Sequence, residues 1–295
     1  MNGSASEARP LLVGVDGSEV ALAAVRWAAA FAARLHAPLR LAYATPPLEP
    51  YIGELMVSTS GELTKEMKDR GRAYLDAATT VADEAQPELT VDSVLVESTF
   101  SDFCAVESAY VQMIVLGSRR SGLIRDLTLG GESIRILNHA DCPVLLWRDL
   151  LPTAPLSTRP VVVGIDDSPA AKHALIAAFD YAGVLGAPLV VAHFWRVGGL
   201  AGGWSAGLFD WQEFQNRASG WLNAQIEPLC DKYPSVEVQR ICYEASPAVA
   251  LQSFSSSAQM VVVGTRGHNR VIGSALGAVS QNLAHHSDCS VLVVH

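Results

Sequence analysis

The chain has 295 residues, about twice the usual length of a single domain, so two domains are expected. Hydrophobic residues make up 49% of the sequence and charged residues 17%, which is enough apolar material for a sizeable core and excludes a disordered or fibrous chain. With 21 Lys and Arg against 30 Asp and Glu, the formal net charge is −9, and this acidic balance excludes nucleic acid as a main partner.

Short apolar runs alternate with longer helical segments along the first half of the chain. The runs are rich in β-branched residues and bounded by Asp or Gly, as is typical of buried strands, and Ser18 stands where a helix N-cap is expected. In chain order the expected elements are a strand at Leu11–Val15, a helix at Glu19–Leu35, a strand at Leu39–Ala44, a helix at Leu63–Ala85, a strand at Thr90–Glu97, a short helix at Asp102–Ser108, a strand ending in Gly117, a helix at Glu132–His139 and a strand at Val144–Trp147.

The second half of the chain repeats the first. Leu12–Ser18 recurs as Val162–Ser168, offset by 150 residues, and Met113–Arg119 recurs as Met260–Arg266, offset by 147. The expected elements of this copy are a strand at Val161–Ile165, a helix at Ala170–Leu185 capped by Ser168 with Pro169 at its first position, a strand at Leu189–Phe194, a helix at Trp211–Lys232, a strand at Val236–Glu244, a helix at Ala248–Ser257, a strand ending in Gly264, a helix at Val279–His286 and a strand at Val291–Val294.

This repeat predicts two homologous domains, residues 1–150 and 161–295, joined by a proline-containing linker at 151–160. Strands that alternate with helices are typical of a parallel, doubly wound α/β sheet with right-handed crossovers. In such sheets, ligands bind beyond the carboxyl ends of the strands, where the strand order reverses. A ligand site is therefore expected at that edge of each domain.

A glycine-flanked loop follows the fourth strand of each copy. In the second copy, Gly264-Thr265-Arg266-Gly267 is followed after nine residues by Gly277-Ala278-Val279-Ser280. The backbone N–H groups of such a loop and the helix N-terminus beyond it form a cradle for phosphates, to which Arg266 adds a charge and Ser280 a hydroxyl. Turns from strand to helix need glycine anyway, so the glycines alone leave a purely structural explanation equally open.

Asp16 and Asp166, each placed at the end of the first strand of its copy, strengthen the ligand-binding interpretation. With these residues the repeat resembles the universal stress protein family in its tandem two-domain form. Nucleotide-binding members of that family carry Gly-x-x-Gly, nine residues and then Gly-Ser/Thr, and Gly264, Gly267 and Gly277 stand at this spacing. The resemblance implies two Rossmann-like domains of the adenine nucleotide alpha hydrolase-like type, each a five-stranded parallel sheet with helices on both faces, and ATP as the ligand, with or without Mg²⁺.

The resemblance also implies roles for individual residues. It places Asp16 and Asp166 near the ribose and adenine, Ala44 and Phe194 near the base, and the glycine loops around the phosphates. The residues implied in nucleotide binding are Gly14, Asp16, Ala44, Gly117, Arg119, Gly130, Gly131 and Ser133 in the first copy, and Gly164, Asp166, Phe194, Gly264, Arg266, Gly267, Gly277, Ala278 and Ser280 in the second.

Three positions depart from the family pattern. Arg120 stands where the second glycine is expected, Gly131 stands where Ser or Thr is expected with Ser133 two residues on, and Ala278 takes the Ser/Thr position in the second copy. An arginine in place of a tight-turn glycine either forces another loop path, if φ must be positive there, or adds a phosphate ligand. Both alternatives stay open.

No catalytic motif is present: the sequence has no Walker A pattern, no Gly-x-Ser-x-Gly elbow and no HExxH helix. The leading hypothesis is a nucleotide-dependent regulator or sensor in stress or growth control, with no catalytic residue. The alternatives are a nucleotide-free interaction scaffold, an enzyme such as a slow ATPase or adenylate-forming protein, and an electron-transfer flavoprotein-like domain, which predicts a yellow protein.

Other features predict the setting of the protein. The five cysteines form no Cys-x-x-Cys pair, and neither a signal peptide nor a membrane span is visible, so a cytoplasmic protein is expected. Cys142 and Cys289, at the start of the last strands, are expected as small core residues, and His193 as a packed strand residue. The resemblance implies that the last strands, Val144–Trp147 and Val291–Val294, pair within one chain. A homo-oligomer is also expected, and regulation implies a protein partner that the sequence does not name.

Overall fold

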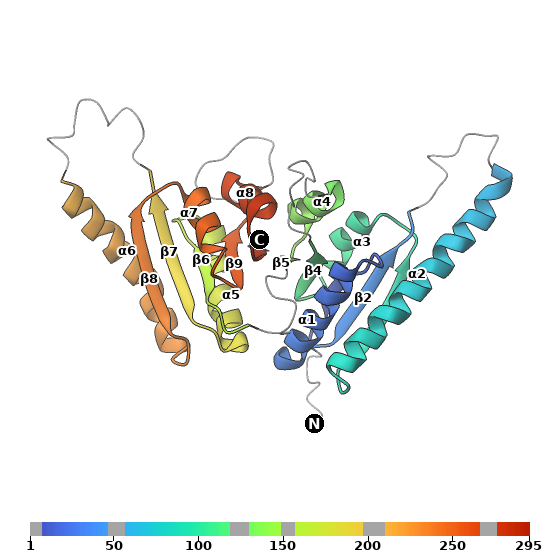
Figure 1. Cartoon of the computed structure of the whole chain (residues 1–295). Coiled ribbons are helices and arrows are strands. Elements are labelled where there is room, and N and C mark those ends of the chain that lie inside the picture. The colour runs from blue at the N-terminus through green and yellow to red at the C-terminus, as the bar shows by residue number, and fades with distance from the viewer. Residues whose placement is uncertain (1–7, 47–56, 119–129, 149–156, 197–209, 266–275) are drawn as a thin grey trace, which may run out of the picture. The chain divides into compact units, whose positions relative to one another are not determined.

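The chain divides into two compact units, Met1–Leu156 and Ser157–His295, hereafter unit 1 and unit 2. The computed structural model describes residues 8–46, 57–118, 130–148, 157–196, 210–265 and 276–295 (Figure 1). Most of the predicted linker, 151–156, lies outside the described residues.

Unit 1 contains a parallel sheet in which, among the described residues, the strand order is β3-β2-β1-β4-β5. The order reverses between β1 and β4, so this is the switch point at which ligands bind in open α/β sheets. The elements are β1 (Leu11–Gly14), α1 (Glu19–Leu35), β2 (Leu39–Ala44), α2 (Val57–Ala85), β3 (Val91–Val96), α3 (Phe100–Glu107), β4 (Met113–Gly117), α4 (Gly131–His139) and β5 (Val144–Trp147).

Unit 2 repeats this architecture with the order β8-β7-β6-β9-β10, again all parallel. Helices cover both faces of each sheet, as the doubly wound prediction requires (Figure 1). The elements are β6 (Val161–Gly164), α5 (Pro169–Leu185), β7 (Leu189–Trp195), α6 (Trp211–Lys232), β8 (Val238–Glu244), α7 (Pro247–Phe254), β9 (Met260–Gly264), α8 (Ala278–His286) and β10 (Ser290–Val294).

The core of unit 1 lies between the central strands and α1. Leu11–Val13 in β1 are fully buried, and so are Ala24, Ala28 and Ala32 on α1. Alanine at these positions lets the helix approach the sheet closely, while Phe31, also fully buried, supplies the volume that fills the interface. Burial on both faces explains why β1 reads as a continuous apolar run rather than an alternating one.

Several predicted helix starts differ from the structure by one to six residues. Helix α2 begins at Val57, six residues before the predicted Leu63, and α7 begins at Pro247, one residue early, because proline suits the first helical position. Helix α3 begins at Phe100 rather than Asp102, because the Thr99 side chain caps it by accepting from the Asp102 N–H at 3.2 Å. The predicted caps Ser18 and Ser168 are confirmed.

Cys142 and Cys289 are 5% and 0% exposed, so their prediction as core residues is confirmed. Across the part of the chain that the structure describes, no helix is long and apolar enough to cross a membrane.

Candidate functional site

An aspartate follows the first strand of each unit and is fixed by the helix after it. Asp16 Oδ1 accepts a hydrogen bond from the Ser18 N–H at 2.9 Å, and Asp166 Oδ1 accepts one from the Ser168 N–H at 3.0 Å. The two serines cap α1 and α5 in turn. The carboxylates are thus held at the carboxyl ends of β1 and β6, with Asp16 exposed and Asp166 half-buried.

The glycines that end the central strands pack against helices. A Cβ added at Gly117 would lie 3.0 Å from the Val20 carbonyl oxygen in α1, and one at Gly264 would lie 2.8 Å from the backbone of Ala170 in α5. These two glycines are required for the close approach of strand and helix. Any role in ligand binding would therefore come from their backbone groups.

Gly14 and Gly164 have a similar environment on the other face of the sheet. A Cβ at Gly14 would lie 2.8 Å from the ring of Phe100 in α3, and one at Gly164 would lie 2.5 Å from Leu251 in α7. Close packing against α3 and α7 therefore explains why these strand ends carry glycine, without any need for a ligand.

Arg119 and Arg120 in unit 1, and Arg266 and Gly267 in unit 2, lie outside the described residues.

The helices that follow these loops begin without a side-chain cap among the described residues. Gly130 and Gly277 are the N-cap residues of α4 and α8, and neither helix start has a side-chain cap hydrogen bond. Among the described residues, a Cβ at Gly130 or Gly131 would have nothing within 4 Å. Backbone N–H groups of a first turn without a side-chain cap suit the binding of an anion such as phosphate.

Ser280 faces inward rather than toward this open end. Its side chain is 2% exposed, and its hydroxyl donates to the carbonyl oxygens of Gly277 at 2.9 Å and Thr265 at 3.2 Å. The Gly277 N–H also donates to Thr265, at 2.7 Å. Ser280 thus ties the start of α8 to the end of β9, and its hydroxyl would have to leave these acceptors to reach a phosphate. Ser133, at the matching position of α4, is half-buried, and Ala278 is exposed.

The two residues predicted near the base differ in environment. Ala44 ends β2 and is half-buried. Phe194 is 6% exposed, and its ring packs against Tyr243 at 4.9 Å and Phe254 at 6.1 Å between ring centroids. Its aromatic surface is therefore used largely within unit 2.

His193 is packed, as predicted, and also holds the end of β6. Its Nδ1 lies 2.9 Å from the carbonyl oxygen of Ile165, the residue before Asp166, and its ring lies 4.7 Å from that of Trp221. Tyr43 occupies the matching position in unit 1, where Gly71 leaves room for its ring. In unit 1 the large ring, Tyr43, comes from strand β2 and faces a glycine of helix α2. In unit 2 the larger ring, Trp221, comes from helix α6 and faces His193 of strand β7.

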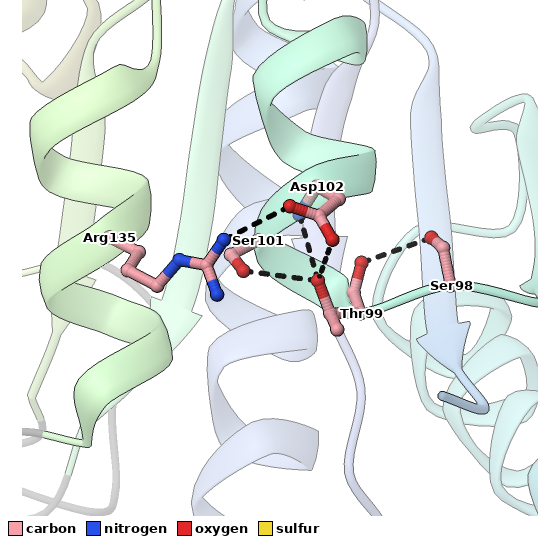
Figure 2. Close-up of polar contacts among 5 residues, drawn as sticks. All are labelled: Ser98, Thr99, Ser101, Asp102 and Arg135. Carbon is pink, nitrogen blue, oxygen red and sulfur yellow. Dashed lines mark hydrogen bonds and ion pairs between the residues drawn. The ribbon is translucent and has the colours of Figure 1, made fainter. Parts of the chain in front are cut away.

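A polar network beside the site of unit 1 was missed by the sequence interpretation (Figure 2). The Thr99 hydroxyl donates to Asp102 Oδ2 at 2.6 Å and lies 3.2 Å from the Ser101 hydroxyl, while Arg135 of α4 donates to Asp102 Oδ1 at 3.1 Å. Ser98 donates to the Thr99 carbonyl oxygen. Threonine followed three residues later by an acidic residue is a capping signature, so Thr99 and Asp102 were recognisable, whereas the partner Arg135 was not.

A buried arginine at the same edge was also missed. Arg148 follows β5, is 5% exposed and donates from Nε to the Ser118 hydroxyl at 3.4 Å. Ser118 is the residue after Gly117, so this guanidinium stands beside the start of the predicted phosphate loop.

Comparisons with known proteins agree with this architecture. The universal stress protein family model matches residues 7–148 and again residues 157–295. A universal stress protein of Mycolicibacterium smegmatis is 31% identical over 294 residues, covering 96% of both chains, and universal stress protein Rv2005c of Mycobacterium tuberculosis is 33% identical over 296 residues, also covering 96% of both. The crystal structure of a universal stress protein from Archaeoglobus fulgidus shares the fold, with a TM-score of 0.71 and 17% identity over 97% of each chain.

Proposed function

The chain belongs to the universal stress protein family, and we propose that it binds ATP at the carboxyl ends of its strands and acts as a nucleotide-dependent regulator in stress or growth control. The observation that carries this proposal is the pairing of an aspartate with an uncapped helix start in each unit. Asp16 follows β1, and the loop leading to α4 follows the neighbouring parallel strand β4. The two groups therefore lie at the same edge of the sheet, at the switch point.

The residues present fit an adenine nucleotide. Carboxylates accept hydrogen bonds, so Asp16 and Asp166 suit the ribose hydroxyls, while the first turns of α4 and α8 suit the phosphates. No described residue lies within 4 Å of a Cβ at Gly130 or Gly131, and this supports the approach of a phosphate to the backbone there.

Any Mg²⁺ would come with the nucleotide. Among the described residues, no group of three or more His, Cys, Asp or Glu side chains could hold a metal ion. Mg²⁺ commonly binds through phosphate oxygens and water with few protein ligands, so a site of this kind accepts the metal as part of the ATP complex.

Binding of this kind can drive regulation without catalysis. A ligand at 100 times its Kd stabilises the conformation that binds it by about 2.7 kcal/mol, which is enough to bias an assembly equilibrium. We propose that ATP shifts the affinity of the chain for a second copy or for a protein partner in the cytoplasm.

Equilibrium dialysis of the full chain with ATP and Mg²⁺ tests the proposal. The variants Asp16→Ala and Asp166→Ala should each weaken one site, whereas Asp16→Asn and Asp166→Asn keep an oxygen for the serine N–H and serve as matched controls for the turn. ATP affinity that all four variants leave unchanged would reject this site.

The two rival functions give different results. A nucleotide-free scaffold binds no ATP in the same dialysis. A slow ATPase binds ATP and releases ADP during prolonged incubation, which chromatography of the dialysate detects.

A further inference from the structure

Strand β8 forms the outer edge of the sheet of unit 2, and from its sequence and register we infer that it pairs antiparallel with β8 of a second copy of the chain. Among the described residues, β8 has a neighbouring strand on one side only, which is β7. An unpaired strand edge is a template for another strand. The inference does not depend on ATP binding, because β8 carries none of the residues assigned to the nucleotide site.

The backbone hydrogen bonds of β8 show which of its residues face the open edge. The Glu237 carbonyl oxygen accepts from the Leu189 N–H at 2.8 Å. The Ala245 N–H donates to the Trp195 carbonyl oxygen at 2.9 Å. Backbone groups of successive residues point to opposite sides of a strand, so the odd-numbered residues of β8 bond to β7. The even-numbered residues therefore point their N–H and carbonyl groups away from β7, and they are Val238, Arg240, Cys242 and Glu244.

These outward-facing residues carry a charge pattern that complements itself. In an antiparallel pair, the hydrogen-bonded positions join outward-facing residues of the two strands. When two copies of β8 meet around a twofold axis at Cys242, each Arg240 lies opposite the partner's Glu244. Registers centred on Arg240 or on Glu244 place like charges opposite each other, and the two registers in between leave both charges opposite uncharged residues. Opposite charges stabilise a cross-strand pair and like charges destabilise it, which favours the register centred on Cys242.

The two charged side chains are accessible for these pairs. Arg240 and Glu244 are both exposed, and neither forms an ion pair within the part of the chain that the structure describes. The Arg240 guanidinium lies 3.8 Å from the Cys230 Sγ in α6. Helix α6 therefore covers this face of β8 only in part, and leaves the ends of the two side chains open.

The other face of β8 carries an apolar pair in the same register. Tyr243 is 42% exposed, although its ring packs against Phe194 at 4.9 Å between ring centroids, and Ile241 is half-buried. With Cys242 at the centre, each Tyr243 lies opposite the partner's Ile241. An aromatic residue opposite a β-branched residue is a favourable cross-strand pair. The same pairing thus satisfies the backbone, joins the charges and covers an exposed aromatic ring.

The matching edge of unit 1 lacks this pattern. With the offset of 147 residues, Ser93 in β3 takes the place of Arg240. Glu97 takes the place of Glu244 and is already paired with Lys68 at 2.7 Å. Two β3 strands in the same register would place each Glu97 opposite a serine. The complementary charges are therefore a property of β8 and not of the repeated fold.

Pairing of this kind gives a closed and weak dimer. A twofold interface uses the β8 edges of both copies, so the pair cannot grow further at this strand. Stable interfaces usually have about 20–30 residues on each side. Strand β8 has seven residues, so the dimer should form at high protein concentration and dissociate on dilution.

Sedimentation equilibrium of the full chain without nucleotide, over a range of protein concentrations, tests the pairing. Arg240→Glu and Glu244→Arg each replace two attractive pairs with two repulsive pairs, so each should raise the Kd of the dimer about tenfold or more. An equimolar mixture of the two variants should dimerise again, because each mixed dimer contains two opposite-charge pairs. Variants that merely misfold would not give this restoration.

Glu97→Arg, at the matching position of unit 1, is the control and should leave the Kd of the dimer unchanged. Hydrogen exchange of the wild-type chain provides a second measurement. The outward-facing amides of Arg240, Cys242 and Glu244 should exchange more slowly as the protein concentration rises, because the partner strand accepts their hydrogen bonds.

A wild-type chain that stays monomeric at millimolar concentration would overturn the inference. A dimer that neither charge reversal weakens, or that the mixture of variants does not restore, would also overturn it. Weakening by Glu97→Arg, together with species larger than a dimer, would show instead that β8 of one copy meets β3 of another. Each of these results would leave the proposed nucleotide site standing, because no nucleotide enters the experiment.

Discussion

The ring of Tyr74, in α2, lies against Gly17 in the turn between β1 and α1, so closely that a Cβ at Gly17 would be 2.4 Å from the ring. Gly17 also has φ +79°, in the left-handed region that favours glycine. Since Gly17 follows Asp16, the long helix α2 packs directly on the turn that holds the carboxylate of unit 1. Unit 2 has Asp167 and Ala224 at these positions.

Gly17→Ala should lower the free energy of unfolding by about 1–3 kcal/mol, because it adds both backbone strain and overlap with the ring. Urea unfolding measures the loss. Gly220→Ala, in the interior of α6 where a Cβ meets nothing within 4 Å, is the matched control and should raise stability by about 0.5–1 kcal/mol. A Gly17→Ala variant as stable as the wild type would show that the turn relaxes around the ring.

The capping residues show how far local sequence determines the fold. Ser18 and Ser168 were predicted as N-caps from their positions before apolar helical segments, and both accept the expected hydrogen bond from the third residue on. The parallel, doubly wound sheet followed from the alternation of strands and helices in the same way. A cap needs only its own helix, so the chain segment contains the whole signal.

Contacts between distant segments could not be predicted from the sequence. Glycine is needed at Gly117 because the backbone of α1, almost 100 residues away in sequence, would lie 3.0 Å from an added Cβ. Similarly, Tyr43 packs over Gly71 in unit 1, whereas His193 packs against Trp221 in unit 2, and each contact joins a strand to a distant helix. The inward turn of Ser280 likewise depends on where β9 ends. Packing of this kind is set by the tertiary structure.

Gly264→Ala should destabilise unit 2 more than Gly164→Ala does. The added methyl group at Gly264 meets the backbone of Ala170 at 2.8 Å, whereas at Gly164 it meets the tip of the Leu251 side chain, which can change rotamer. Overpacking of a core costs about 1–3 kcal/mol, and the backbone overlap should lie at the upper end of that range. Urea midpoints of the two variants give the comparison, and the reverse ranking would contradict the packing described here.

Ser280→Ala should cost about 1–2 kcal/mol, because it removes the hydroxyl that donates to the Gly277 and Thr265 carbonyl oxygens in a buried setting. Ser133→Ala, at the half-buried matching position of unit 1, should cost less than about 0.5 kcal/mol. Chemical unfolding of both variants decides the point. Equal losses of unfolding free energy in the two variants would mean that the hydrogen bonds of the Ser280 hydroxyl add no stability beyond that of the matching serine.

Stability should fall in alkaline solution because burial raises the pKa of the Cys142 thiol from 9.0 to about 12. The unfolded chain loses this proton first, so between pH 9 and about pH 12 the unfolded state binds fewer protons and unfolding becomes more favourable as the pH rises. One pH unit above 9.0, the loss for this thiol should be about 1.4 kcal/mol. Urea unfolding at pH 8 and pH 10 measures it.

Cys142→Ala removes the titrating group and is the control for this pH effect. The variant should show a smaller drop in the urea midpoint between pH 8 and pH 10 than the wild type. Burial raises the pKa of Cys104 as well, so part of the drop should remain. An identical pH dependence in the variant and the wild type would contradict the assignment to Cys142.

Native mass spectrometry of the gently purified full chain, with chromatographic identification of the released small molecules, tests nucleotide binding most directly. With ATP and Mg²⁺ in excess, the account predicts two ATP per chain, one for each pairing of an aspartate with an uncapped helix start. A chain that carries no nucleotide, and takes up none when ATP and Mg²⁺ are added, would contradict it.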